Sequence, residues 1–126
     1  DLLKDQALVG DKAKTNKLIG DTILENEKNI CYINAINQRL MRLLEVTTIA
    51  KDGKVDDAIG KIKPPIFWRD KAIFSLQARK WNRDKINIML NQIYNVELKI
   101  KSNSQISQKI LIKKLLVDIC CLANTS

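Results

Sequence analysis

Histidine is absent from this chain of 126 residues. Without an imidazole there is no histidine general acid or base, no Ser-His or Cys-His nucleophile pair, and no histidine ligand for zinc. The three cysteines, Cys31, Cys120 and Cys121, show neither a disulfide framework nor a Cys-x-x-Cys metal spacing. We expect them to be small buried side chains, because free cysteine is often buried. We therefore expect no catalytic residue, no cofactor and no metal.

Long apolar runs are missing as well. No stretch approaches the roughly 20 residues that span a bilayer, and 45% hydrophobic with 29% charged residues is the balance of a soluble globular protein. The start, DLLKDQALVGDKAK, lacks the basic and then apolar layout of a secretory signal. We expect a cytoplasmic, non-membrane protein with one domain over residues 1–126. A first residue other than Met suggests a piece of a longer chain.

Negative charge is scarce. The chain has 14 Asp and Glu against 22 Lys and Arg, which gives a formal net charge of +8 and a pI near 9.5. Such an excess is typical of nucleic-acid-binding proteins, but here lysines are spread along nearly every segment rather than gathered in one tract. We expect diffuse attraction to phosphate more than sequence readout. A free-standing basic nucleic-acid-binding protein remains an alternative function.

What the chain does have is helical periodicity. Apolar residues recur every three or four positions, no stretch alternates with period two for long, and turn dipeptides such as Asn-Gly are missing. The predicted fold class is all-α, a single bundle of about six or seven helices. We expect helices at 2–9, from a cap at Asp11 to about 25–29, from about Asn29 to Ala50, at 55–62, from the prolines to Lys80, from a cap at Asn82 to about 101–105, and at 106–122. A turn with Asp52 and Gly53 precedes the fourth helix.

The segment KPPIFWRDKAIFSLQARKWNRDK, residues 63–85, contains both prolines, both phenylalanines and both tryptophans. Proline fixes its own φ and restricts the residue before it, so the pair predicts a stiff link at which a helix begins, with Pro65 in its first turn. We favour a structural corner, because aromatic residues at helical spacing usually belong to the core. In this interpretation Trp81, just before Asn82, packs on the following helix as a hydrophobic staple.

The same aromatic residues allow a second interpretation. Trp68 with Arg69, and Arg79 with Lys80 and Trp81, would form an exposed aromatic and guanidinium patch. Such a patch binds a partner protein or stacks on nucleobases. Both interpretations stay open at this point.

Four segments follow one another in a distinctive order. They are RLMRLLEV at 39–46, KPPIFWRDK at 63–71, ARKWNRDKI at 78–86 and VELKIKS at 96–102. This order resembles the C-terminal domain of the delta subunit of bacterial DNA polymerase III. The shared features are a long arginine-bearing helix, a glycine turn, a short acidic helix, Pro-Pro followed by aromatic residues, and a Trp before a polar cap and a long helix. The resemblance runs along most of the chain, more clearly after Arg39 than before it.

This resemblance implies an assembly role. In that family the delta subunit belongs to the clamp loader, whose ATP-driven ring opens the sliding clamp and places it on primed DNA, and the C-terminal domains form a helical collar that holds the pentamer together. The implied partners are the other clamp-loader subunits, of the gamma or tau and delta-prime kinds. The sliding clamp would be contacted only through N-terminal domains that this sequence does not contain, and DNA only weakly or indirectly. Our candidates for the partner interface are Arg39, Arg42, Trp68, Arg69 and Arg79.

Two catalytic alternatives are disfavoured. IGDT at 19–22 and IGKIK at 59–63 each lack the second glycine and the preceding strand of a phosphate-binding loop. Hydrolysis by a pair of carboxylates is disfavoured because the adjacent Asp56 and Asp57 point to different sides of a helix. They suit its first turn, near the positive end of the helix dipole.

The first testable prediction concerns the binding and hydrolysis of ATP. The purified domain should neither hydrolyse ATP nor bind it stoichiometrically, because it has no phosphate-binding loop. Isothermal titration with Mg-ATP should give only the heat of dilution. Saturable binding of one nucleotide per chain would overturn this prediction.

Overall fold

The computed structural model describes residues 2–21, 26–50, 54–102 and 107–125. Across these ranges it contains seven α-helices, one short 3₁₀ helix and no strand. The helices are α1 Leu2–Val9, α2 Lys12–Asp21, α3 Asn26–Ile49, α4 Val55–Ile59, α5 Lys71–Lys80, α6 Arg83–Lys101 and α7 Gln108–Ala123, with the 3₁₀ helix η1 at Trp68–Asp70. The all-α prediction is confirmed. The turn predicted at Asp52 and Gly53 lies outside the described residues.

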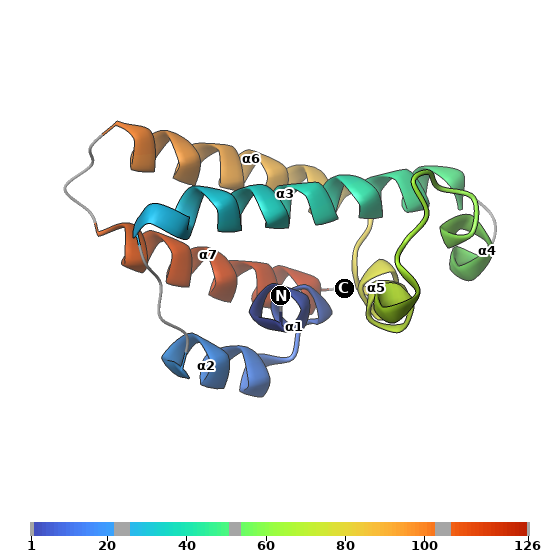
Figure 1. Cartoon of the computed structure of the whole chain (residues 1–126), viewed down its shortest axis with the longest axis horizontal. Coiled ribbons are helices and arrows are strands. Elements are labelled where there is room, and N and C mark those ends of the chain that lie inside the picture. The colour runs from blue at the N-terminus through green and yellow to red at the C-terminus, as the bar shows by residue number, and fades with distance from the viewer. Residues whose placement is uncertain (1, 22–25, 51–53, 103–106, 126) are drawn as a thin grey trace.

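Three long helices, α3, α6 and α7, form the body of the molecule (Figure 1). Each of them packs on the other two, and α6 runs antiparallel to both α3 and α7. Helices α1 and α2 pack on α7, while α4 and α5 pack on α3. Helix α1 also packs on α2 and α5, so it links α5 to α2 and α7. None of the helices in the described part of the chain has the length and apolar character needed to cross a membrane.

The core follows from the three-and-four spacing of apolar residues. Large side chains from five helices are almost completely buried and form one cluster. They are Leu8, Ile33, Ile36, Leu40, Leu43, Phe74, Ile86, Met89, Ile112, Leu115, Leu116 and Ile119. Burial of this apolar surface is the main favourable free-energy contribution to the bundle.

Both predicted helix caps are present. The Asp11 side chain accepts a hydrogen bond from the Lys14 backbone N–H at 3.0 Å, at the start of α2. The Asn82 side chain accepts one from the Lys85 backbone N–H at 2.9 Å, at the start of α6. Each cap satisfies an N–H that has no partner within its helix.

Lys85 ties the ends of two other helices to α6. Its buried ammonium group donates to the backbone carbonyls of Lys80 at 3.0 Å, Ala123 at 3.5 Å and Thr125 at 2.5 Å. These carbonyls lie at the carboxyl ends of α5 and α7, where a cation is favoured by the helix dipole. Lys85 therefore fixes where α5 and α7 end relative to the start of α6.

The helix that follows the prolines begins later than predicted. Pro65 does not lie in a first helical turn, because η1 starts only at Trp68 and α5 at Lys71. The Lys63–Pro64 peptide bond is cis. Arg42 of α3 donates from Nη1 to the Lys63 carbonyl at 3.1 Å and from Nη2 to the Pro64 carbonyl. Those carbonyls are thus bound by a side chain instead of by helical N–H groups.

The cysteines also differ in part from expectation. Cys120 is buried, and burial raises the pKa of its thiol. Cys31 and Cys121 are exposed, so the prediction was wrong for these two. Adjacent residues of a helix lie about 100° apart, and Cys121 cannot share the inward direction of Cys120.

The aromatic corner is present at Phe74 and Trp81. Phe74 is fully buried on α5, and Trp81, directly after α5, is only 3% exposed. The Trp81 indole donates from Nε1 to the Leu8 carbonyl of α1 at 2.7 Å. The buried ring therefore joins the end of α5 to α1 through packing and through a hydrogen bond.

The two tryptophans should respond differently to truncation. Trp81→Ala should lower the free energy of unfolding by about 3 to 5 kcal/mol, because it leaves a cavity and an unpaired Leu8 carbonyl. Trp68→Ala is the control, and it should change that free energy by less than about 0.5 kcal/mol because Trp68 is exposed. Urea unfolding followed by circular dichroism measures both. A loss below roughly 1 kcal/mol for Trp81→Ala would contradict the described burial.

Candidate functional site

Phe67, Trp68 and Arg69 form an exposed cluster between the prolines and α5, which we call the aromatic patch. Phe67 is 56% exposed and Trp68 is 69% exposed, so the corner prediction was wrong for these two rings. Their centroids lie 5.9 Å apart with an interplanar angle of 43°. The Arg69 guanidinium lies 5.7 Å from the Phe67 centroid and 5.3 Å from the Trp68 centroid. Cation–π attraction therefore holds the three side chains together on the surface.

The backbone beneath the aromatic patch is fixed at both ends. Before the patch, Ile62 is buried and Ile66 packs on the core, while Arg42 binds the carbonyls of Lys63 and Pro64. After it, the Asp70 N–H donates to the Phe67 carbonyl at 2.8 Å. The two rings thus project outward from a segment with few backbone alternatives.

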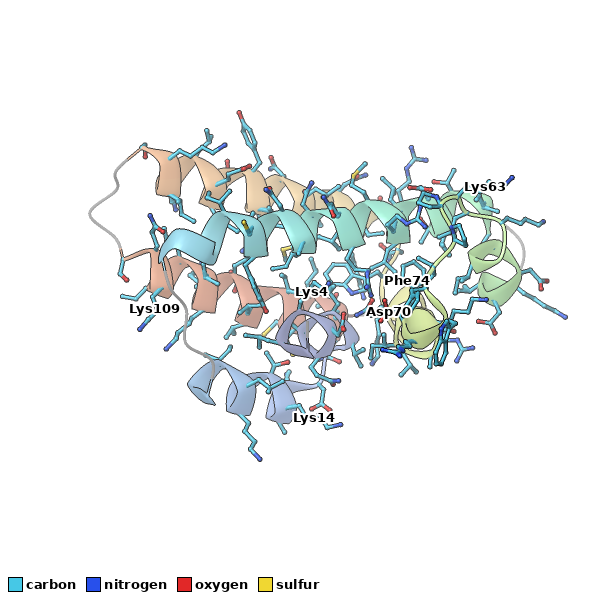
Figure 2. All side chains as sticks on the ribbon, viewed as in Figure 1. Lys4, Lys14, Lys63, Asp70, Phe74 and Lys109 are labelled. Carbon is cyan, nitrogen blue, oxygen red and sulfur yellow. The ribbon has the colours of Figure 1, made fainter. Side chains whose placement is uncertain are left out.

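A groove of about 530 Å³ lies beside the aromatic patch, which we call the α3 groove. It is lined by one side of α3, by Lys4 of α1, and by the segment from Pro64 to Phe67 with Asp70. Three cations, Lys4, Arg39 and Arg42, line it with apolar neighbours such as Met41. In Figure 2, Lys4 and Asp70 lie close together where α1 meets α5.

Arg39 has internal partners. Its Nη1 donates to the Gln77 side-chain oxygen at 2.9 Å and lies 3.5 Å from Asp5 Oδ1, and its guanidinium lies 5.5 Å from the Phe74 ring centroid. Gln77 is fully buried and donates from Nε2 to the Asp5 carbonyl at 3.1 Å. Arg39 therefore links α3 to α1 and α5, and its role at a partner interface stays a prediction.

Arg79 belongs to a different cluster. It lies 3.4 Å from the Asp56 carboxylate of α4, and the Ser75 hydroxyl donates to that carboxylate at 2.8 Å. Both charged side chains of this pair are well exposed, so the pair contributes little to stability. Asp56 lies in the first turn of α4, as predicted, and α4 packs on α5.

Of the five predicted interface residues, the structure brings Trp68 and Arg69 into one patch and places Arg42 against the proline segment that precedes it. Sequence reasoning missed Phe67 and Lys4. The signal for Phe67 was its position directly beside Trp68, which was itself an interface candidate. No sequence signal distinguished Lys4, because only the tertiary fold brings α1 to this groove.

Among residues 2–21, 26–50, 54–102 and 107–125, no group of three or more Cys, Asp or Glu is placed to hold a metal ion. Comparison of the chain with protein families, curated proteins and solved structures found no match. The resemblance to the delta subunit accordingly stays a prediction that rests on the four segments.

Replacing arginines should separate structural from surface roles. Arg39→Met should lower the free energy of unfolding by about 1 to 3 kcal/mol, because it leaves the buried Gln77 oxygen without its donor. Arg69→Met, at an exposed position, should change it by less than about 0.5 kcal/mol. Urea denaturation of both variants measures this difference. Equal losses would contradict the internal role of Arg39.

Proposed function

We propose that this domain is a non-catalytic assembly module, the collar domain of a delta subunit in a clamp loader of the DNA polymerase III type. It acts in the cytoplasm by holding clamp-loader subunits together, so that the sliding clamp can be loaded on primed DNA. The observation that carries the proposal is the exposed aromatic patch, which lies within KPPIFWRDK, one of the four segments of the resemblance.

The chemistry of the aromatic patch is suited to a protein interface. Tryptophan and arginine are enriched among the residues that contribute most binding energy, and such residues lie where water is excluded on binding. The patch stands on a segment that Arg42 fixes through two carbonyls. A preorganised surface loses less conformational entropy on association.

The nucleic-acid alternative has weaker support. The rings have the exposure needed for stacking, and the chain has a net charge of +8. However, Arg69 already lies over both rings. The cations of the α3 groove, Lys4, Arg39 and Arg42, are also recessed. A nucleic-acid backbone, with its row of phosphates, is best bound by exposed cations.

Salt should separate the two functions. Mixing the domain with gamma or tau and delta-prime subunits should give a complex that survives physiological salt, because apolar and aromatic contacts depend little on ionic strength. Binding to duplex DNA should be weak, independent of sequence, and lost steeply over the same salt range. A salt titration of both events with one protein preparation measures this. Tight, salt-resistant, sequence-dependent DNA binding without subunit association would refute the proposal.

Trp68→Ala tests the patch itself. It should weaken subunit association by on the order of tenfold or more, since truncating a central aromatic residue removes a large share of binding energy. Tyr94→Ala is the matched control, because Tyr94 is a comparably exposed ring on α6. Equal effects of the two substitutions would exclude the aromatic patch as the interface.

A further inference from the structure

Two stretches of the sequence carry no charge. Residues 29–38 and 86–96 contain no Asp, Glu, Lys or Arg, although 29% of the chain is charged. The first stretch lies in α3 and the second in α6, and these helices pack side by side in opposite directions (Figure 1). The fold thus brings together two segments that the sequence keeps about 50 residues apart.

Uncharged side chains of both helices share one outward surface, which we call the uncharged face. Asn34, Asn37, Met41 and Tyr94 line a hollow of about 310 Å³ between α3 and α6. Tyr94 is 58% exposed and Met41 is 45% exposed. Three residues before Tyr94 and four after it, two further exposed side chains lie on the same side of α6. The uncharged face consists of Asn34, Asn37 and Met41 of α3 and Asn91, Tyr94 and Leu98 of α6.

Two carboxylates lie at the edges of the uncharged face, each beside a cation. Glu97 lines the hollow from α6 and lies 3.3 Å from Lys101. Glu45 follows Met41 by one turn of α3 and lies 3.6 Å from Arg42. Each edge pair has no net charge, so the edges do not make the face acidic or basic.

Loss of charge from a surface is typical of a protein interface. The centres of such interfaces are depleted of Lys, Asp and Glu and enriched in aromatic residues and Met. Tyr94 and Met41 supply exposed groups of these two kinds. A nucleic acid, in contrast, is bound through cations, which the uncharged face does not contain.

We propose that the uncharged face binds a second copy of this chain, so that the domain forms a two-fold symmetric dimer through α3 and α6. In such a dimer the same surface of both copies meets. A primary amide has both donors and an acceptor, so the Asn side chains can hydrogen-bond with those of the other copy. Met41, Tyr94 and Leu98 supply the apolar contacts. This inference goes beyond the proposed function and does not rest on it.

Net charge selects this occupant. Two copies with a net charge of +8 each repel one another wherever their lysines come together. They approach at the least electrostatic cost through a surface that has no charge. A different protein would gain most by presenting carboxylates to the lysines of this basic chain, and the uncharged face offers it no cation. The second copy is therefore the partner for which the absence of charge is an advantage.

Sedimentation equilibrium of the whole chain at several salt concentrations tests the dimer. It should show a monomer–dimer equilibrium whose dissociation constant falls by at least roughly threefold between about 0.05 and 0.5 M salt, because salt screens the repulsion between the two net charges. Binding to DNA should change in the opposite direction over the same range. Salt thus distinguishes an uncharged interface from contacts held by opposite charges.

Three substitutions locate the interface. Asn91→Lys should weaken dimerisation by roughly tenfold or more, because it adds a charge to both sides of a two-fold interface. Asn34→Lys should do the same from α3. Asn16→Lys is the matched control, since Asn16 is an exposed asparagine of α2, and it should change the dissociation constant by less than about twofold. All three positions are exposed, so the thermal midpoint should stay that of the wild type.

Four outcomes would overturn the proposal. The chain could stay monomeric at every concentration and salt, or Asn16→Lys could weaken the dimer as much as Asn91→Lys does. Loss of the dimer in Trp68→Ala would assign self-association to the aromatic patch instead. Loss of clamp-loader subunit binding in Asn91→Lys, with a chain that is monomeric alone, would assign the uncharged face to a different protein.

Discussion

The arrangement of this bundle depends on how the end of α5 is tied to α1. The Trp81 indole donates to the Leu8 carbonyl at 2.7 Å, and the Gln77 amide donates to the Asp5 carbonyl at 3.1 Å. These bonds join parts of the chain more than 70 residues apart. Both donors are buried, so losing either partner leaves a polar group without water or protein to satisfy it. These two directional bonds add to the packing of α5 on α1 in fixing its position.

The surface features depend on the same junction. Because α5 is fixed by α1 at its carboxyl end, the aromatic patch at its amino end also has a fixed place. Arg39 and Arg42 lie on α3 on either side of Leu40 and serve two purposes: Arg39 joins the internal network around Gln77, and Arg42 holds the proline segment. The α3 groove is what remains between α3, α1 and that segment. Binding surface and core therefore share the same arginine-bearing helix.

Much of the fold could be predicted from the sequence, and the surface only in part. Apolar spacing predicted α2, α3, α5, α6 and α7, and Asp11 and Asn82 predicted two helix starts, because periodicity and caps are local properties. The boundary between α2 and α3 was placed too late, since α3 begins at Asn26. The helix start at the prolines was placed too early, since nothing local reveals that Arg42, more than 20 residues away, binds the Lys63 and Pro64 carbonyls. The place of Trp81 just before the cap at Asn82 predicted that it packs inside, whereas for Trp68 the sequence left both a corner and an exposed patch open. Only the tertiary contact with Leu8 makes the first a core residue, while the second lies in η1 with its neighbours Phe67 and Arg69.

The central claim is that Trp68 faces a protein partner while Trp81 serves the fold. The chain has only these two tryptophans, so fluorotryptophan labelling gives two fluorine NMR resonances, which Trp68→Phe assigns. Without partner, the Trp68 resonance should show a solvent isotope shift and the Trp81 resonance should not. On addition of the other clamp-loader subunits, the account predicts that the Trp68 resonance moves and loses its solvent isotope shift, with the Trp81 resonance unchanged. Formation of the complex with an unaltered, solvent-exposed Trp68 resonance would contradict it.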